Sequence, residues 1–294
     1  MRILTPFLQV FVWVIPALSQ DVEGGPISAA VFGGNNAEPG QFPFIGSLQE
    51  KTHDNPNGTH ICGAVLIDKK WALTAAHCLC PSPYPSKVFF GDINLKQKSP
   101  SHHESRVLRA PHKYYDTTLE NDIALIAIRD DVKDYNQNVS EVSLATSSDE
   151  ISLYEKCFVA GWGYTSDENY LSDALQYAEV KLVNSSICKA KWWDFNETVI
   201  CAQNTTSDAC KGDSGGPLVC SKKSSTALEL VGIVSYGVNV CMPGNPGVYT
   251  RVSAFQEWIA ENRSTKPFLT IPLWLITVMF GYQLLEQYSY FILF

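Results

Sequence analysis

One short segment, Gly212–Pro217, reads Gly-Asp-Ser-Gly-Gly-Pro and combines a nucleophilic side chain with a backbone that can turn sharply. Glycines tolerate the backbone conformations of tight turns, so the hydroxyl of Ser214 would be exposed there. The N–H groups of Gly212 and Ser214 could then point at the same spot. Two converging amides stabilise an oxyanion, which acyl transfer requires. The segment therefore predicts acyl-transfer chemistry at Ser214.

A serine hydroxyl is a weak nucleophile until a base takes its proton, so a histidine is needed. His77 is the candidate because it follows the apolar strand-like run Trp71–Ala76 and precedes a cysteine, where burial would hold the ring still. Asp122 begins another apolar run, and a carboxylate there needs a partner such as the Nδ1–H of His77. The five other histidines lie in polar, loop-like stretches: His53, His60, His102, His103 and His112.

Many short β-type runs must position these groups, with clusters of Gly, Pro, Asn and Ser between them. This pattern predicts an all-β barrel or sandwich. One helix is predicted near the end of the domain, with Ser253 as a plausible N-cap and Phe255, Trp258 and Ile259 on one face. The clearest β-type runs are 64–67, 87–90, 123–128, 157–162, 227–236 and 247–252.

Composition excludes several classes of protein. The chain has 294 residues, of which 45 % are hydrophobic and 18 % charged, so it is globular rather than disordered or fibrous. Its formal net charge is −8, which is the wrong sign for gripping phosphate backbones and argues against a nucleic-acid partner.

The N-terminus and the cysteines indicate the secretory pathway. Residues 1–19 have a basic start, an apolar run and small residues at the end, as in a signal peptide. Nine cysteines suggest disulfides made in an oxidising compartment. Six Asn-x-Ser/Thr sequons predict surface glycans at Asn57, Asn138, Asn184, Asn196, Asn204 and Asn262.

The C-terminal segment 264–294 is hydrophobic, and no charged residue occurs from 268 to 285. Eighteen uncharged residues are the lower edge of a membrane span. A lipid-anchor signal with attachment near Asn262, Ser264 or Thr265 is the second interpretation. A tail that packs on the domain or is disordered is the third.

Four short motifs occur in one order: TAAHC at 74–78, NDIAL at 121–125, GWG at 161–163 and GDSGGP at 212–217. In this order and spacing the chain resembles the chymotrypsin-like (trypsin-family) serine proteases over about 31–263. The resemblance implies two antiparallel six-stranded β-barrels with a C-terminal helix, and a cleft between the barrels. It also implies that His77 is the base, Asp122 the orienting carboxylate and Ser214 the nucleophile, with no cofactor.

The resemblance further implies four disulfides, which spacing alone leaves open because eight cysteines allow 105 pairings. Cys80 is then the odd cysteine, either free and buried or paired between molecules. The implied pairs are Cys62–Cys78, Cys157–Cys220, Cys188–Cys201 and Cys210–Cys241.

Substrate preference follows from Asp208, which in this family lies at the base of the primary specificity pocket. A carboxylate there would pair with Arg or Lys of a substrate. Gly237 and Gly247 match the pocket walls and leave room for a long side chain. Ala209 offers no hydroxyl to hold a Lys ammonium, so Arg is expected to be preferred over Lys. The backbone of Ser235, Tyr236 and Gly237 would bind an extended substrate.

Activation departs from the family pattern. The resemblance implies that cleavage frees the amino group of Val31, which then pairs with Asp213. The preceding residue is Ala30, and no Lys or Arg occurs between Arg2 and Lys51. The predicted propeptide, 20–30, therefore needs an activating protease of small-residue specificity.

The expected function is a secreted or membrane-attached endopeptidase that cleaves proteins or peptides after Arg, with protein protease inhibitors as further partners. The alternative is a catalytically silent or permanently zymogen-like homologue that acts as a binding module. No metal site is expected, since segment 92–106 holds only two acidic residues and the pair His102 and His103 is not a zinc site by itself.

Overall fold

The computed structural model describes residues 31, 33–51, 58–79, 87–111, 119–146, 151–164, 170–192, 196–237 and 243–264. The predicted signal peptide, the propeptide with Ala30, Cys80 and all but the first residue of the C-terminal segment lie outside these ranges. Across the described ranges, no helix combines the length and apolarity that a bilayer crossing requires.

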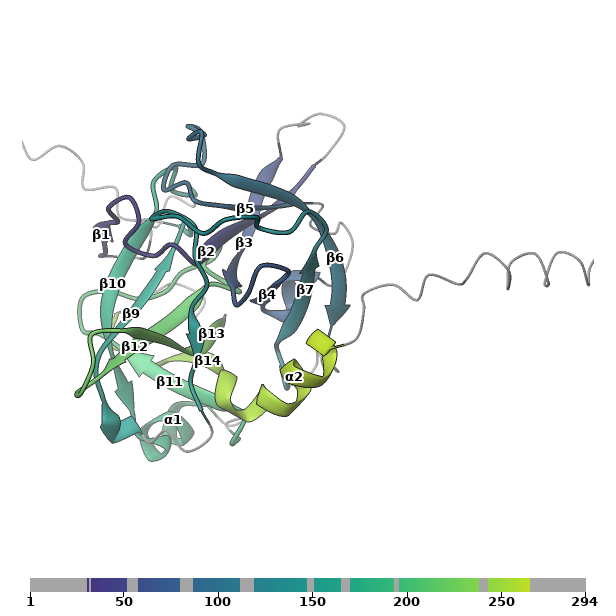
Figure 1. The fold of residues 1–294 in the computed structure, drawn as a ribbon. Helices are drawn as coiled ribbons and strands as arrows, with labels where there is room; N and C mark the ends of the chain where they lie inside the picture. Colours follow the sequence, from purple (N-terminus) through teal and green to yellow (C-terminus); the bar gives the residue numbers. More distant parts are fainter. Residues whose placement is uncertain are drawn as a thin grey trace, which may run out of the picture.

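Six antiparallel strands form a first, closed barrel in the order β2-β3-β4-β7-β6-β5 (Figure 1). Three of these strands are buried along their whole length: all five residues of β7, and all four of β4 and of β5. Most of these buried residues are apolar, and they contribute to the core of the barrel. The strands are β2 (Ile45–Glu50), β3 (Thr59–Leu66), β4 (Trp71–Thr74), β5 (Lys87–Phe90), β6 (His103–Pro111) and β7 (Ala124–Ile128).

A second group of six antiparallel strands runs β10-β11-β14-β13-β12-β9, and pairing of β9 with β10 closes it. Two short strands extend it: β1 (Asn35–Asn36) pairs with β10, and β8 (Ser143–Leu144) lies parallel to β13. The six strands are β9 (Tyr154–Gly161), β10 (Gln176–Val183), β11 (Val199–Gln203), β12 (Pro217–Lys222), β13 (Leu228–Tyr236) and β14 (Gly247–Arg251).

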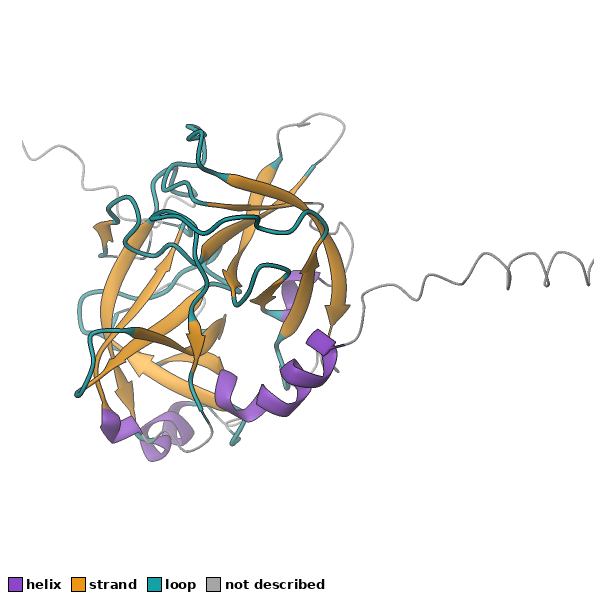
Figure 2. Cartoon of the chain, viewed as in Figure 1, coloured by secondary structure: helices purple, strands orange, loops and turns teal. Residues whose placement is uncertain are grey.

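Helical segments in the described ranges are short and lie at the edges of the barrels (Figure 2). The chain leaves β14 through a 3₁₀ turn, η3 (Val252–Phe255), before the helix α2 (Gln256–Ser264). Ser253 therefore lies inside η3 and is not an N-cap, contrary to our expectation, because the turn carries Val252 and Phe255 into the core first. The others are η1 (Ala76–Leu79), η2 (Ile151–Leu153) and α1 (Ser185–Lys191).

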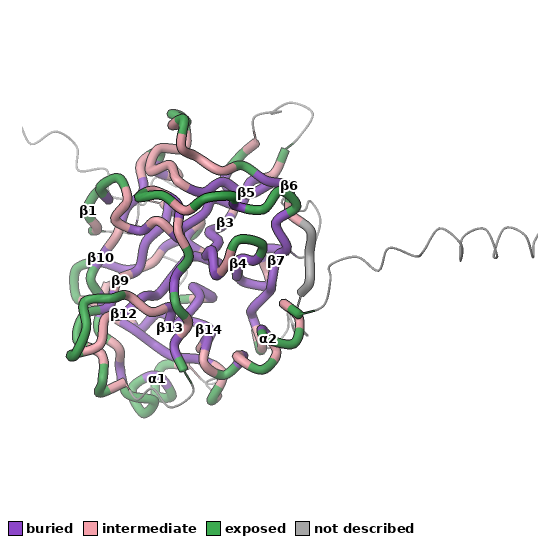
Figure 3. The backbone as a smooth tube through the Cα atoms, viewed as in Figure 1, coloured by how far each residue is buried: buried purple, intermediate pink, exposed green. Residues whose placement is uncertain are grey.

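Buried residues follow the interior of both barrels, whereas most exposed residues lie in connections (Figure 3). One hydrophobic cluster joins the interior of the first barrel to Ile259 of α2, so this helix packs on the same core. The expected fold class, two six-stranded antiparallel barrels with a C-terminal helix, is confirmed.

Candidate active site

His77 lies on η1, directly after β4, and contacts Asp122 through two hydrogen bonds. Its backbone N–H donates to Asp122 Oδ1 at 2.9 Å, and its Nδ1 is 2.8 Å from Asp122 Oδ2. Asp122 lies two residues before β7 begins. Two residues ahead of it, Leu119 and Asn121, have left-handed backbone, which asparagine tolerates better than most residues. This sharp turn directs the carboxylate toward η1.

Asp122 is 1 % exposed, and two strands of the second barrel also hold it. Ser235 Oγ donates to Oδ2 at 2.5 Å, and Thr250 Oγ1 donates to the backbone carbonyl of Asp122 at 2.7 Å. Burial by itself raises the pKa of this carboxyl, but the hydrogen bonds from His77 and Ser235 outweigh burial and hold the pKa below its ordinary value. The carboxylate therefore stays ionised and fixes the imidazole.

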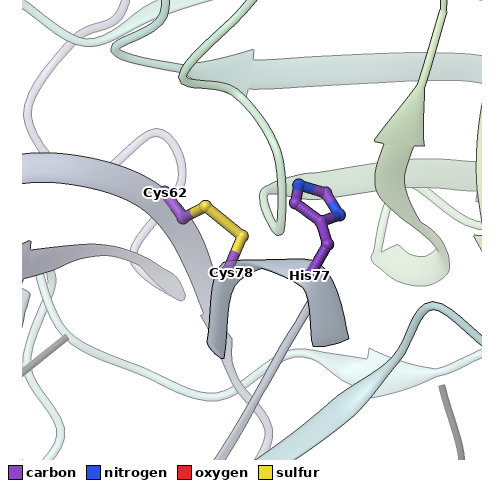
Figure 4. Close-up of side chains that lie close together, drawn as sticks. All are labelled: Cys62, His77 and Cys78. Carbon is purple, nitrogen blue, oxygen red and sulfur yellow. A yellow bond between two sulfur atoms is a disulfide. The ribbon is translucent and has the colours of Figure 1, made fainter. Parts of the chain in front are cut away.

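A disulfide lies beside the imidazole. Cys78 follows His77 on η1 and is bonded to Cys62 of β3, with an S–S distance of 2.06 Å (Figure 4). Ligand-type atoms of these three residues lie within 4.8 Å of one another, as a metal site would require. Because the two sulfurs are bonded to each other, neither is a thiolate, and the group does not fit a metal.

Backbone contacts bring Ser214 to the same place. Its carbonyl accepts from the N–H of Gly63, the residue next to Cys62, at 2.7 Å. Gly215 follows with φ of 78°, and a Cβ there would lie 2.2 Å from Thr74 Oγ1, so only glycine fits. The turn that carries Ser214 therefore packs on the strand that leads to His77.

The GWG motif makes room for Asp213. A Cβ on Gly161 would lie 2.1 Å from Asp213 Oδ1, and one on Gly163 would lie 2.6 Å from its Cγ. The carboxylate accepts from the N–H of Gly163 and of Cys210, both at 2.8 Å. Burial raises the pKa of Asp213 to about 7, against the effect of these two amides. No cation contacts this carboxylate within the described residues.

Two predicted activation residues are therefore buried. Val31 is fully buried and packs in the core of the second barrel, in one cluster with Cys157 and Leu218. Its carbonyl accepts from the N–H of Gly34 at 2.7 Å. The start of the described chain is thus folded into the barrel that carries Asp213.

His60 is not in a loop, contrary to our expectation from sequence. It is 5 % exposed on β3, with Nδ1 2.8 Å from Ser47 Oγ and Nε2 2.9 Å from the carbonyl of Gly212. A carbonyl only accepts, so Nε2 carries the proton and Ser47 donates to Nδ1. Burial lowers the pKa of His60 to about 4, so the ring is neutral. The polar neighbours in the sequence concealed an inward position on a strand.

The turn at Gly212 is held from several sides. Its φ is 97°, and a Cβ would lie 2.7 Å from Leu171 Cδ2 and 2.9 Å from Gly163 Cα. His60 Nε2 donates to the carbonyl of Gly212 and so fixes this peptide unit. Leu171 was not considered from sequence, and His60 was expected in a loop, so neither contact with Gly212 was predicted.

A cavity of about 180 Å³ opens beside Ser214, with Asp208 in its lining. Asp208 is 6 % exposed, and burial together with the charge of Asp213 raises its pKa to about 7, while the N–H of Ala209 acts against this. A Cβ on Gly247 would lie 3.5 Å from Asp208 Oδ1, whereas one on Gly237 would meet nothing within 4 Å. All predicted pocket residues line this cavity: Asp208, Ala209, Ser235, Tyr236, Gly237 and Gly247.

Three of the four implied disulfide pairs are present: Cys62–Cys78, Cys157–Cys220 and Cys188–Cys201. Cys210 is also disulfide-bonded, and its implied partner, Cys241, lies outside the described residues.

Five of the six sequons are described, and their asparagines differ in exposure. Asn184 is exposed, whereas Asn138, Asn196, Asn204 and Asn262 are partly exposed. Asn196 and Asn204 each accept a hydrogen bond from the threonine of their own sequon. Asn138 Nδ2 donates to Ser101 Oγ, and Asn262 Nδ2 donates to the carbonyl of Trp258. Asn57 lies outside the described residues.

Comparison with known proteins agrees with this geometry. The family model described as Trypsin matches residues 31–259. The chain belongs to the trypsin family of serine proteases. It is 32 % identical over 250 residues to a protein of Rattus norvegicus named "Transmembrane protease serine 9", covering 82 % of this chain. This trypsin-family chain spans only 23 % of that relative's length.

Proposed function

We propose that this trypsin-family chain is an extracellular serine endopeptidase that cleaves after Arg and, less well, after Lys. The observation that carries the proposal is the cavity beside Ser214, where Asp208 is buried and no cation contacts it within the described residues. A buried carboxylate is costly without a partner, so the cavity favours a substrate that brings the positive charge.

In the proposed mechanism, Ser214 Oγ attacks the substrate carbonyl while His77 Nε2 takes its proton. Asp122 accepts from Nδ1, which holds the tautomer that leaves Nε2 unprotonated, and it stabilises the imidazolium that forms. The N–H groups of Gly212 and Ser214 stabilise the oxyanion. His77 then protonates the leaving amine as the C–N bond breaks, which leaves an acyl group on Ser214. In the second half, His77 takes a proton from a water molecule that attacks the acyl group, and it returns a proton to Ser214 Oγ as the acid product leaves.

The specificity step uses the raised pKa of Asp208. Burial in the pocket raises the pKa of this carboxyl to about 7, and an entering guanidinium would lower it, so the bound state would be an ion pair. Arg reaches the carboxylate with two nitrogens, whereas Lys has a single ammonium and finds no hydroxyl at Ala209. Arg is therefore preferred.

Activation is proposed to follow cleavage between Ala30 and Val31 by a protease of small-residue specificity. The new amino group would pair with the carboxylate of Asp213, which now lacks a cation among the described residues. That pairing would anchor the turn that carries Gly212 and Ser214. The zymogen-like alternative retains one argument, the absence of a basic residue before Val31.

Residues 1–19 are proposed as a signal peptide, 20–30 as a propeptide, 31–263 as the protease domain and 264–294 as a hydrophobic tail. Disulfides in the domain support an oxidising compartment. Attachment by the tail is tested by detergent partitioning with and without a phospholipase that cuts lipid anchors. Phospholipase-sensitive partitioning supports a lipid anchor, resistant partitioning supports a span, and no partitioning contradicts attachment.

The proposed activity is tested on the full chain with a fluorophosphonate probe, before and after treatment with an elastase-like protease. We expect labelling of Ser214 only after treatment, together with cleavage of an Arg peptide faster than peptides with Phe, Leu or Ala at that position. Ser214→Ala is the control for specific labelling. Absence of labelling under both conditions contradicts the enzyme and favours the binding module.

A further inference from the structure

Thr74 carries a buried hydroxyl that the mechanism above does not use. It is the last residue of β4, a strand whose four residues are all buried, and it is itself fully buried. Burying a hydroxyl costs free energy unless it is hydrogen-bonded, whereas valine has nearly the same shape and carries no such cost. The contacts of this hydroxyl therefore indicate what a threonine does at the end of β4.

The hydroxyl links β4 to the backbone of Ser214 through one glycine. Thr74 Oγ1 donates to the carbonyl of Gly63 on β3 at 2.8 Å. Backbone pairing between β3 and β4 reaches only Val65 opposite Leu73, so the side chain of Thr74 continues the contact beyond the paired residues. The N–H of Gly63 in turn donates to the carbonyl of Ser214 at 2.7 Å.

The turn that carries Ser214 also lies directly against Thr74. A Cβ on Gly215 would lie 2.2 Å from Thr74 Oγ1 and 2.5 Å from the carbonyl oxygen of Gly63. A Cβ on Gly63 would lie 2.7 Å from Cα of Gly216. No side chain separates the two backbones, and the β-branched Thr74 is stiff at χ1. The position of its hydroxyl therefore determines how closely the turn approaches β4.

Thr74 is also connected to the two partners of Ser214. His77 follows it by three residues, on η1. Ala124, which pairs with Thr74 between β4 and β7, lies two residues after Asp122. Thr74 thus lies where the segments that carry all three proposed triad residues meet.

We propose that Thr74 is a positioning residue that sets the distance between Ser214 Oγ and His77 Nε2. Its hydroxyl holds the turn of the second barrel against the end of β4, the strand that leads to the imidazole. The inference rests on the proposed proton transfer from Ser214 to His77. Its effect is on kcat rather than on substrate binding, because Thr74 is not among the residues that line the cavity with Asp208.

The test uses the full chain after elastase-like treatment, with an Arg peptide, a small fluorophosphonate and a guanidinium compound as competitive inhibitor. Thr74→Val and Thr74→Ala remove the hydroxyl, with and without a group of similar size in its place. In both, kcat and the rate of Ser214 labelling should fall about 10- to 100-fold, up to the scale of a 1 Å misplacement. KM and the inhibition constant should stay within about threefold of the wild-type values, since the pocket is unchanged.

Thr74→Ser keeps the hydroxyl and should retain kcat within about threefold of the wild-type value. Ser105→Ala is the matched control for loss of a buried hydroxyl. Ser105 is also buried in the first barrel, and its Oγ accepts from the N–H of Asp130 at 2.9 Å. This control should lower the free energy of unfolding in urea but leave kcat per folded molecule unchanged.

All rates are compared per folded molecule, and Thr74→Ala provides the comparison where Thr74→Val does not fold. Wild-type kcat in either variant, or an equal loss in Thr74→Ser, overturns the inference while the proposed activity stands. A rise in KM and in the inhibition constant with kcat unchanged also overturns it. A wild-type chain that neither labels nor cleaves contradicts the proposed function, and the inference with it.

Discussion

The two barrels treat their buried carboxylates in opposite ways. Asp122, at the edge of the first barrel, accepts hydrogen bonds from His77 and Ser235, and its pKa is lowered in spite of burial. Asp208 and Asp213 belong to the second barrel, and burial raises the pKa of each to about 7. The hydrogen bonds described for these two carboxylates come from backbone N–H groups: Gly163 and Cys210 donate to Asp213, and Ala209 donates to Asp208.

One carboxylate is held ready by the fold, whereas the other two are suited to bind a cation that arrives later. In the proposed mechanism the first barrel supplies the base, His77. Its orientation is complete before any ligand arrives, because the groups that hold Asp122, including Ser235 and Thr250 of the second barrel, are all part of the fold. The second barrel supplies carboxylates whose burial is costly until a cation reaches them. On the proposed function, the substrate brings one cation to Asp208 and the new amino terminus brings the other to Asp213.

The largest effect is expected from a substitution of Asp122, the carboxylate that the fold holds in place. Asp122→Asn keeps the shape but holds the wrong tautomer of His77, so kcat should fall about 10⁴-fold. Fluorophosphonate labelling of Ser214 should slow as well, because it needs the same base. Asp173→Asn, an exposed aspartate paired with Lys96, is the control. Labelling at the wild-type rate in Asp122→Asn would contradict the assigned role.

Asp208→Asn tests the recognition side. Without the carboxylate the pocket no longer pairs with Arg, so kcat/KM for an Arg peptide should fall roughly 10³-fold, as expected when a buried charge pair loses one partner. A small fluorophosphonate that does not enter the pocket should label Ser214 within about threefold of the wild-type rate. If both quantities fell together, the two barrels would not divide the work as proposed.

Two glycines in the pocket wall, Gly237 and Gly247, give a second test of the proposed contact between the substrate and Asp208. A methyl group at position 247 would lie 3.5 Å from Asp208 Oδ1, where the guanidinium approaches in the proposed complex, whereas at position 237 it would meet nothing within 4 Å. Gly247→Ala should lower kcat/KM for Arg peptides up to about 10²-fold, the scale of misplacement by about 1 Å. Gly237→Ala should cost tenfold or less. Equal losses in steady-state kinetics would contradict Asp208 as the contact.

Much of this arrangement could be predicted from the sequence because the motifs carry steric reasons. A side chain at Gly161 or Gly163 would clash with Asp213, and one at Gly215 would clash with Thr74. Only glycine fits at these three positions, so their spacing from Ser214 is specific. The strands were recognisable because buried runs such as 87–90 are short and bounded by turns.

Other contributors could not be predicted because their roles depend on contacts across the fold. His60 lies 152 residues from Gly212 along the chain, and Ser235 lies 113 residues from Asp122. A polar residue on a strand gives no local sign of which face it occupies when its neighbours are also polar. The prediction of Ser253 as an N-cap was wrong for a similar reason. Phe255 packs in the core, and a 3₁₀ turn that contains Ser253 precedes the helix.

The smallest expected effect concerns stability and tests whether Asp213 awaits a cation. Its pKa in the folded, uncleaved chain is about 7, above the ordinary 3.8. A raised pKa means that the folded state binds the proton more tightly, so this contribution to stability is full below about pH 4 and is lost as pH rises through 7. Cleavage before Val31 should supply an amine that lowers this pKa again and restores the loss.

The free energy of unfolding should therefore be higher for the cleaved than for the uncleaved chain by roughly 2 kcal/mol more at pH 8 than at pH 5. Urea unfolding of both forms at the two pH values measures the difference. Asp208 titrates in both forms, and only the part of its pKa shift that comes from the charge of Asp213 differs between them. Asp213→Asn has no group to titrate there and should show no such pH-dependent gain. A gain of the same size in that variant would place the effect of cleavage elsewhere than at Asp213.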